Sequence, residues 1–457
     1  MTSADVVVVG GGPTGLTAAL GAARRGLAVR LVDAAPGFGG MSASTTVGGQ
    51  RVDLGSHRLH PSMSAPVRAL LTELLGDDLQ TRARNGRLLL RGRWVRFPFR
   101  AVDLARSLPP AFTVASVRDA ATARWRRPTA DSYAEVVRVG LGPTALADFH
   151  GPMAAKLWGR PADRLAGELA RRRVSVRTPG AVVRTVARTS RPDGRTFLYP
   201  RLGYGQIVDR LVDAATAAGA ELSHSTTVAS LRPPATPADP VRVVLGDGAE
   251  IEAGRVLWSA APEALVAAAG SAVPDGDRSE LRSMVLVYLV VPSPRFTEFD
   301  AHYVPDPGVC FSRLSEPRNY RDGPDPEGTT VLCAEIPCSE GDDTWTASDA
   351  DLAERVLDGL GRCGLGRPRV AAVETRRLPR VYPVIDVDDP DRRRRVLARA
   401  DAVPGVTVLG RQGLVVADNL HHVIDMALAA VECLGAGWDD DRWARHRERF
   451  DGFVVQD

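Results

Sequence analysis

The sequence predicts an α/β protein in which a discontinuous, Rossmann-like dinucleotide-binding domain is combined with an inserted helical region and an antiparallel-sheet substrate domain. The first observation is a buried-strand pattern at residues 6–9 that leads directly into a glycine-rich turn. Helical apolar spacing then dominates residues 62–190, and strand patterns dominate residues 283–336. A final strand at 406–409 and a helix at 423–434 are available to complete the first domain.

The first element is a strand that runs into a turn and a helix. Gly10, Gly12 and Gly15 give the spacing G-x-G-x-x-G immediately after the valines of residues 6–9. Glycines at these places let the backbone turn tightly and approach a pyrophosphate at the N-terminus of the helix predicted over 16–25. The pattern therefore predicts a dinucleotide site.

An acid closes this unit. A second strand is predicted over residues 27–32, and Asp33 follows it, where a carboxylate can accept hydrogen bonds from ribose hydroxyls. Its negative charge argues against a 2′-phosphate, which favours FAD or NAD over NADP. The alternative is a glycine-rich turn that binds nothing. The strand, helix, second strand and acid follow one another at the spacing of a dinucleotide-binding unit, which argues against this alternative.

The remaining elements follow in chain order. Helices are predicted over 65–75, 101–107, 113–125, 132–141 and 146–157, with a hairpin at 87–95. A helix over 207–218 precedes strands at 222–231, 241–245, 255–259, 283–291, 309–314 and 330–336, and a helix follows over 350–360. The predicted division is 1–61, 196–265 and 386–457 for the nucleotide-binding domain, 62–195 for the mainly helical insertion and 266–385 for the substrate domain with its antiparallel sheet.

Composition limits the partners and the location. A net charge of +3 over 457 residues does not suggest nucleic acid. No apolar run reaches membrane-spanning length and the first strand begins at once, so we expect a cytoplasmic protein. The basic segment 100–127 has apolar spacing that suits an anionic bilayer, but packing as a helical cover is the favoured interpretation. Five cysteines without a C-x-x-C pair indicate free thiols and no metal site.

Lys156 is the only lysine in a chain whose other basic residues are arginines. Such a bias is typical of a high-GC genome, in which lysine is retained where arginine will not serve. An ammonium differs from a guanidinium as a compact charge with a tunable pKa. A functional role for Lys156 and chance retention both remain open.

The N-terminal run resembles the extended fingerprint of the FAD-dependent amine oxidase and protoporphyrinogen-oxidase-like flavoproteins, including the branch similar to UDP-galactopyranose mutase. The resemblance continues through Asp33 to the glycine pair Gly39–Gly40, which in that family lies against the diphosphate and the isoalloxazine. It implies FAD as the cofactor. Two departures are visible, because Asp33 replaces the usual Glu and Met41 stands where many members have Arg.

Residues 53–60 are similar to a G-x-H-x-x-H segment of the mutase-like branch that runs beside the flavin. The resemblance implies a flavin-site role for His57 and, less firmly, for His60, because an imidazole can donate a hydrogen bond or move a proton near neutral pH. The Lys-Leu-Trp-Gly segment at Lys156, with Arg173 farther on, resembles the branch's Lys-Val-Trp-Gly and its later arginine.

Later segments extend the resemblance. Residues 199–206 resemble the family's Tyr-Pro-x-Gly-Gly-x-Gly stretch, and 311–316 resemble a mutase-branch segment whose arginine binds the substrate diphosphate. Residues 410–413 and 418–422 resemble the closing segment, where helix-start amides and Arg411 would favour negative charge on the flavin.

The implied site residues fall into three groups. The cofactor-binding residues are Gly10, Gly12, Pro13, Thr14, Gly15, Asp33, Gly39, Gly40, Met41, Gly55, Ser56, His57, Val228, Gly410, Arg411, Asn419 and Leu420. The catalytic candidates are His57, His60, Lys156 and Arg313, and the substrate-binding candidates are Arg201, Tyr204 and Arg313. No set of ligands with metal-binding spacing is present.

The expected activity is that of an FAD-dependent oxidoreductase, a dehydrogenase, oxidase or desaturase, that takes a hydride from a small molecule of specialised metabolism. O₂ is one candidate electron acceptor, and the sequence does not indicate an oligomeric state. The alternative is a non-redox flavin-dependent mutase, and a third hypothesis is a non-enzymatic flavin-binding protein. Val415, Val416 and Ala417 stand where the mutase-like branch has tyrosine and other aromatic residues, which weakens the case for a sugar-diphosphate substrate.

Overall fold

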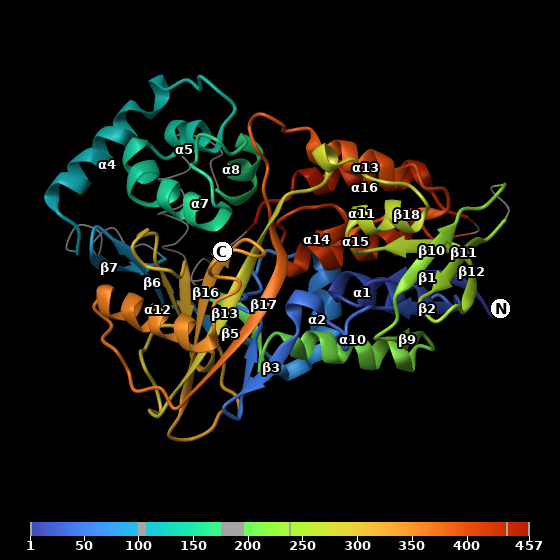
Figure 1. Ribbon diagram of the computed structural model, residues 1–457, viewed down its shortest axis with the longest axis horizontal. Helices are drawn as coiled ribbons and strands as arrows, with labels where there is room; N and C mark the ends of the chain where they lie inside the picture. Colours follow the sequence, from blue (N-terminus) through green and yellow to red (C-terminus); the bar gives the residue numbers. More distant parts are fainter. Residues whose placement is uncertain (1, 99–106, 175–195, 237–238, 436, 456–457) are drawn as a thin grey trace.

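The structure is a computed structural model that describes residues 2–98, 107–174, 196–236, 239–435 and 437–455. Two large sheets and a helical cluster make up this part of the chain (Figure 1). This arrangement confirms the predicted fold class. The helix expected over 101–107 lies almost wholly outside the described residues. Within the described ranges, no helix is both long and apolar enough to cross a bilayer.

The first sheet is the nucleotide-binding sheet, with strand order β10-β11-β12-β1-β2-β9 and β18 joined to β12. Its central strands β1, β2, β9, β12 and β18 are parallel, whereas β11 is antiparallel to both β10 and β12. The valines of β1 are buried on both faces, as the apolar run predicted. The strands are β1 (Thr2–Val9), β2 (Val29–Val32), β9 (Glu221–Ser223), β10 (Val228–Arg232), β11 (Val241–Leu245), β12 (Glu250–Trp258) and β18 (Val406–Val408).

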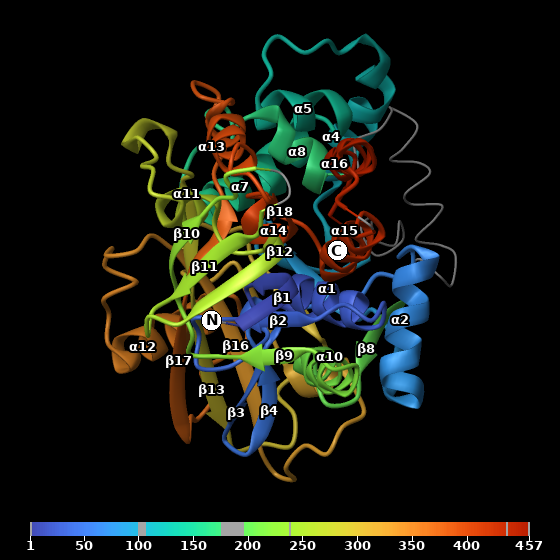
Figure 2. The same cartoon turned by 90° about the vertical axis from the view of Figure 1, so that its right-hand side faces the viewer.

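Helices from opposite ends of the chain cover this sheet. α1 packs against both α10 and α15, and β18 completes the sheet beside β12 (Figure 2). The N-terminal and C-terminal segments therefore share one hydrophobic core. The helices are α1 (Pro13–Ala23), α2 (Ala65–Leu75), α10 (Gly205–Ala217), α11 (Pro262–Ala268), α13 (Arg392–Asp401), α14 (Gly410–Gly413), α15 (Leu420–Glu432) and α16 (Asp440–Asp451).

The second sheet has the order β17-β13-β16-β15-β14-β6-β7 and is the predicted antiparallel sheet, with one parallel pair between β14 and β6. Its centre is β13, which pairs with β16 and β17 and buries nearly all its side chains. The hairpin predicted at 87–95 is present as β6–β7, and it extends this sheet. The elements are β6 (Gly86–Leu90), β7 (Arg93–Phe97), β13 (Leu281–Val291), β14 (Ala301–Tyr303), β15 (Arg313–Ser315), β16 (Thr330–Cys338), β17 (Ala372–Pro383) and α12 (Asp349–Arg362).

The helical insertion forms a third unit with its own apolar cluster, in which Trp158 and Leu165 are fully buried. Its helices are α4 (Pro110–Thr122), α5 (Tyr133–Gly140), α6 (Pro143–Ala145), α7 (Gly151–Trp158) and α8 (Gly167–Arg173). Two small antiparallel ribbons connect the units: β3 (Ser44–Val47) with β4 (Gln50–Asp53), and β5 (Leu79–Ala83) with β8 (Thr196–Pro200).

Candidate active site

The glycine turn between β1 and α1 has the close contacts that its spacing predicts. Gly10 has φ +104°, and a Cβ on Gly15 would lie only 1.9 Å from the carbonyl oxygen of Gly10. A Cβ on Gly12 would meet nothing within 4 Å, so the turn is open on that side. Pro13 begins α1 directly after Gly12. The unpaired amides of the first helical turn suit a pyrophosphate there.

Asp33 braces this turn from the end of β2. Its Oδ2 accepts a hydrogen bond from the Gly11 amide, and its Oδ1 accepts one from the Ala35 amide at 2.7 Å. The chain after β9 lies alongside, because the Thr226 amide donates to the Asp33 carbonyl at 2.8 Å, and β10 begins at Val228 two residues later. Each carboxylate oxygen keeps a lone pair for a ribose hydroxyl.

The second glycine pair packs against the first turn. The Gly39 amide donates to the Gly11 carbonyl at 2.7 Å, and Gly39 and Gly40 have φ of +113° and +53°, where a side chain is strained. Met41 follows and contacts the buried cluster of β13 that includes Leu286 and Tyr288. The glycine pair thus joins the phosphate turn to the second sheet.

The C-terminal closing segment reaches the same turn. A Cβ on Gly410 would lie 2.7 Å from Thr14 Oγ1, so the backbone of α14 touches the first turn of α1. Arg411 Nη1 donates to the Asp418 carbonyl at 2.8 Å and Nη2 to the Val381 carbonyl at 2.7 Å. Its Nε has no partner among the described residues, and burial lowers the pKa of Arg411 below that of a free guanidinium.

The start of α15 lies next to this arginine. Asn419 is its N-cap, in a reciprocal capping arrangement with His422, and Leu420 is its first residue. Four buried apolar residues connect Arg411 to this helix, namely Leu414, Val415, Val416 and Ala417. Val415 has φ +52°, a strained value for a β-branched residue.

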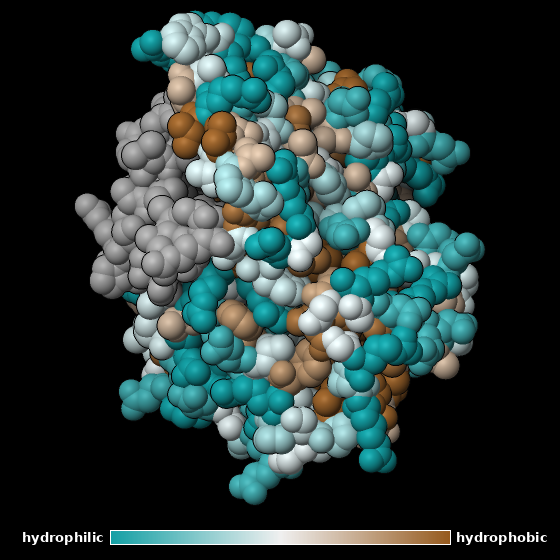
Figure 3. All heavy atoms as spheres, turned by 90° about the vertical axis from the view of Figure 1, so that its left-hand side faces the viewer, coloured by the Kyte–Doolittle hydropathy of each residue, from teal (hydrophilic) through white to brown (hydrophobic). Residues whose placement is uncertain are grey.

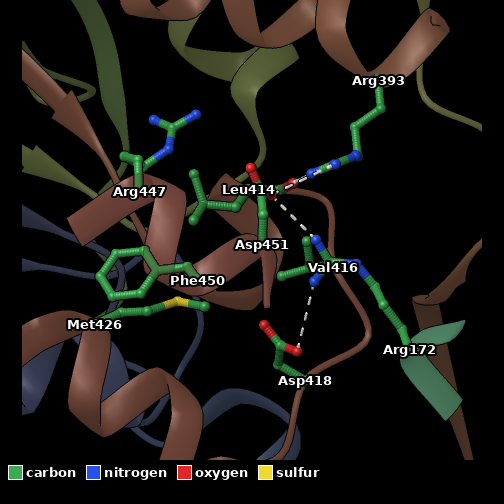
Figure 4. Close-up of a pocket in the computed structure, with 9 residues that line it drawn as sticks. All are labelled: Arg172, Arg393, Leu414, Val416, Asp418, Met426, Arg447, Phe450 and Asp451. Atoms are coloured by element: carbon green, nitrogen blue, oxygen red, sulfur yellow. Dashed lines mark hydrogen bonds and ion pairs between the residues drawn. The ribbon is translucent and has the colours of Figure 1, made fainter. Parts of the chain in front are cut away.

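A small cavity of about 20 Å³ lies behind the closing segment (Figure 4). Figure 4 shows Arg172 of α8 extending between Asp418 and Asp451, with Arg393 above them. Arg172 Nη2 donates to Asp451 at 3.2 Å, and its Nη1 lies 3.9 Å from the fully buried carboxylate of Asp418. The carboxylate of Asp418 thus faces the helical insertion, while its carbonyl holds Arg411.

His57 lies in the chain that follows β4 and is held on two sides. Its Nε2 lies 3.0 Å from the Leu54 carbonyl, and its ring stacks on Tyr204 with centroids 4.9 Å apart and planes 20° apart. Burial lowers the pKa of His57, which favours the neutral imidazole. Neutral His57 donates from Nε2, so its Nδ1 is the acceptor.

Asp53 is a buried acid beside His57 that the sequence interpretation did not single out. Its carboxylate accepts from Ser44 Oγ at 2.6 Å, from the Tyr204 amide at 2.8 Å and from the Tyr199 hydroxyl. Its carbonyl accepts from the Tyr288 hydroxyl at 2.6 Å. Asp53 thereby ties the His57 segment to β3, α10 and β13.

Arg313 is paired with a second unpredicted acid, Glu335 of β16. Arg313 Nε and Nη2 donate to the two oxygens of Glu335, both at 2.8 Å. Glu335 Oε1 also accepts from the Ser56 amide at 2.8 Å, which places the predicted Gly55–Ser56 segment beside this ion pair. The charge of Arg313 is therefore largely balanced within the protein.

Two arginines lie over the ring of Tyr382 at the end of β17. The guanidinium carbons of Arg173 and Arg411 lie 5.1 and 5.8 Å from the ring centroid of Tyr382. The Glu335 carboxylate, with smaller contributions from Tyr303 and Tyr382, raises the pKa of Arg313 above that of a free guanidinium. Arg173 Nη1 has no hydrogen-bond partner in the described part of the chain. This cluster is suited to an anionic or electron-rich group.

Lys156 makes contacts that favour a structural role. Its Nζ donates to the carbonyls of Val304, Asp306 and Phe311 at 2.8, 2.5 and 3.1 Å, which uses all three of its donors. Burial lowers the pKa of Lys156 to about 8. A guanidinium could not place its donors on three converging carbonyls in this way, which gives a reason for a lysine here.

Two other candidates also lie among local partners. His60 Nδ1 contacts Ser62 Oγ at 2.7 Å, and burial lowers the pKa of His60 to about 4, so this ring is neutral. Arg201 is exposed and donates to Asp78 at 3.0 Å. The structure thus groups the glycine turns, Asp33 and the closing segment. Lys156 and Arg201 do not belong to this group, because their side chains contact other residues.

Comparison with known proteins identifies the class to which this fold and site belong. The family model described as flavin containing amine oxidoreductase matches residues 13–418. The chain therefore belongs to that family, is an enzyme of it and uses FAD, as the glycine pair implied. No curated protein matches the chain.

Solved structures agree with this assignment at the level of the fold. Reduced UDP-galactopyranose mutase superposes with a TM-score of 0.79 at 18% identity, covering 99% of this chain and 100% of that one. A putative protoporphyrinogen oxidase from Exiguobacterium sp. 255-15 gives 0.71 at 20% identity, with 94% and 98% covered. Wild-type putrescine oxidase bound to putrescine gives 0.62 at 17%, again with 94% and 98% covered. The predicted resemblance is confirmed, and these relatives include both oxidases and a mutase.

The residues present fit a flavin dinucleotide. The turn is open at Gly12, the amides at the start of α1 are available, and Asp33 stands at the end of β2. Arg411, in the closing segment, has an Nε without a hydrogen-bond partner in the part of the chain that the structure describes. Within the described residues no group of three His, Cys, Asp or Glu side chains could hold a metal ion.

Proposed function

We propose that this enzyme is an FAD-dependent oxidoreductase that removes a hydride from a small organic substrate, as a dehydrogenase, an oxidase or a desaturase. Bound FAD supplies the hydride acceptor. The chain's own residues bind it, orient it and set the electrostatic potential around it. The observation that carries the proposal is the part-buried guanidinium of Arg411, whose buried Nε has no hydrogen-bond partner among the described residues.

Arg411 is well placed to favour negative charge beside it. Two carbonyls hold its Nη atoms, and the N-terminus of α15 follows within a few residues, so a full charge and a helix dipole act together. A fixed positive potential stabilises the charge that develops when a hydride is accepted, because no solvent reorganisation is needed. This is what an oxidoreductase requires of its closing segment.

The surroundings of Arg411 also favour an organic substrate without a sugar diphosphate. Residues 414–417 are apolar and buried, so this segment brings no phenol hydroxyl of its own to bind phosphate oxygens.

A mutase similar to UDP-galactopyranose mutase is the second candidate. The arginines around Tyr382 favour it, because guanidinium groups bind diphosphate oxygens in bidentate pairs. Arg313, the arginine that the resemblance assigns to the substrate, is already engaged by Glu335. We therefore place the oxidoreductase first.

The deciding experiment is anaerobic mixing of the oxidised holoenzyme with amines, alcohols and partly saturated rings. Loss of the oxidised flavin absorbance without added reductant supports the oxidoreductase. Turnover of a nucleoside-diphosphate sugar only after prior reduction, with no net redox change, supports the mutase and overturns the first proposal.

The role of Arg411 has its own readout. The Arg411→Gln substitution should lower the flavin midpoint potential by ~30 mV or more, equivalent to about 1.4 kcal/mol for a two-electron couple. Arg411→Lys keeps the charge and should retain most of the potential. Arg394→Gln, on the exposed side of α13, is the matched control. An unchanged midpoint potential in Arg411→Gln would show that Arg411 does not stabilise the reduced flavin.

A further inference from the structure

One helix presents apolar side chains to solvent. Val114, Val117 and Trp125 are 68%, 63% and 63% exposed, and they are the large hydrophobic side chains that stand exposed in the described ranges. All three come from α4 and the 3-10 turn Ala123–Trp125 at its end. Scattered exposed apolar residues need no explanation, but their confinement to one element does.

The spacing places these residues on one side of the helix. Val114, Val117 and Ala121 are three and four positions apart, which is one helical face, and Trp125 continues it. The opposite side of α4 is docked, because the buried carboxylate of Asp119 accepts from the Thr144 amide at 2.9 Å. Thus α4 is anchored on α6 and leaves an outer face, which we call the α4 face: Val114, Val117, Arg118, Ala121, Arg124 and Trp125.

The charged side chains on the α4 face are all positive. Arg118, Arg124 and the following Arg127 are exposed, and the Arg124 guanidinium lies 4.1 Å from the Trp125 ring centroid. The one acid between residues 107 and 127 is Asp119, which is buried on the other side. The next acid, Asp131, is engaged by Arg171 at 2.6 Å.

The position of α4 makes this face accessible. Figure 1 shows α4 at the outer edge of the molecule, away from the nucleotide-binding sheet. In Figure 3, which faces this side, apolar side chains in brown lie among hydrophilic ones in teal in the upper part of the surface. In the described part of the segment, the Asp119 side of α4 packs on α6, whereas the α4 face does not pack against the protein.

We propose that the α4 face docks on an anionic lipid bilayer. Valine and tryptophan side chains enter the boundary between headgroups and acyl chains, while arginines beside them meet the lipid phosphates. A second copy of this chain is a poorer occupant, because a two-fold contact through this face would bring Arg118 and Arg124 against their own copies. Contact through one short helix predicts reversible, salt-sensitive binding.

The test is co-sedimentation of the holoenzyme with vesicles of phosphatidylcholine alone or with about 30% phosphatidylglycerol. We expect binding to the anionic vesicles, little binding to neutral ones and release in about 0.5 M NaCl. Replacing both arginines, Arg118→Gln with Arg124→Gln, should weaken binding about 30-fold, since each charge near the surface contributes roughly fivefold. The paired change Val117→Ser with Trp125→Ser should abolish it at either salt concentration.

Controls separate this docking from a general charge effect. Arg210→Gln, at an exposed position of α10, removes one charge elsewhere and should bind as the wild type does. Tryptophan fluorescence should shift to the blue with anionic vesicles in the wild type but not in Trp125→Phe. Absence of binding to anionic vesicles at low salt overturns the proposal, as does equal binding by the α4-face variants. A particle mass in solution that falls to the monomer in Val117→Ser would instead identify a second copy as the occupant and also overturn it.

Discussion

The carboxylate of Asp33 offers the sharpest test of the cofactor site. In Asp33→Asn the side chain keeps one acceptor oxygen and places an NH₂ group where the second oxygen stood. At present Oδ2 accepts from Gly11 and Oδ1 from Ala35, so one of these amides would face a donor. The charge that ribose hydroxyls meet is lost as well.

The magnitude follows from the bonds lost. A hydrogen bond to a charged acceptor contributes about 1.5–3 kcal/mol. Losing one such bond to ribose raises the Kd for FAD about 10- to 150-fold. Misalignment of the Gly11 amide adds to this, because that amide belongs to the phosphate turn.

The assay is fluorescence titration of the apoprotein with FAD. Asp33→Glu restores both the charge and two oxygens and should bind within a few-fold of the wild type. Asp358→Asn, an exposed acid of α12 paired with Arg367, is the control for surface charge. If Asp33→Asn binds FAD within twofold of the wild type while its urea transition is unchanged, the assignment of Asp33 is wrong.

Three further outcomes follow from the contacts. Gly15→Ala should abolish FAD binding, because its Cβ would lie 1.9 Å from the Gly10 carbonyl; retained binding would show that the turn can rearrange. Glu335→Leu should destabilise the fold by about 3–5 kcal/mol in urea unfolding, since the largely buried Arg313 is left without its carboxylate partner. The double change Arg313→Met with Glu335→Leu should recover most of that stability, and equal losses in the single and double variants would refute the ion-pair argument. The pKa of Lys156 is about 8 in the folded protein against 10.5 when free, so the unfolded chain binds more protons between these values. Wild-type stability relative to Lys156→Met should therefore rise from about pH 8 to 10.5, and a difference that is constant with pH would contradict the burial of this ammonium.

The parts of the fold that local pattern governs were predictable from the sequence. The helix expected over 65–75 is α2, and the strand expected over 241–245 is β11. By contrast β17 and α16 were not foreseen. In β17 three arginines, Arg376, Arg377 and Arg380, interrupt the apolar alternation, and the strand forms because β13 supplies a partner from far along the chain. The helix α16 carries mostly charged residues over a narrow apolar stripe.

The candidate site also combines residues that act through local contacts with residues that depend on partners far along the chain. The glycine turns and Asp33 act through neighbours close in sequence, so their spacing was informative. Glu335 acts through Arg313 and Ser56, which lie on other elements. One signal did exist, because Glu335 is a charge within the otherwise apolar run of β16, and a buried charge needs a partner.

The contact between Gly410 and Thr14 has a consequence for synthesis of the protein. The phosphate turn leaves the ribosome early, but β18, α14 and α15 arrive roughly 400 residues later, which at ~5–20 residues per second is about 20 to 80 s. During that interval α1 lacks the apolar face of α15 and β12 lacks one parallel neighbour. Capture of FAD is therefore expected to be a late event, and a chain cut short before the closing segment should emerge without its flavin.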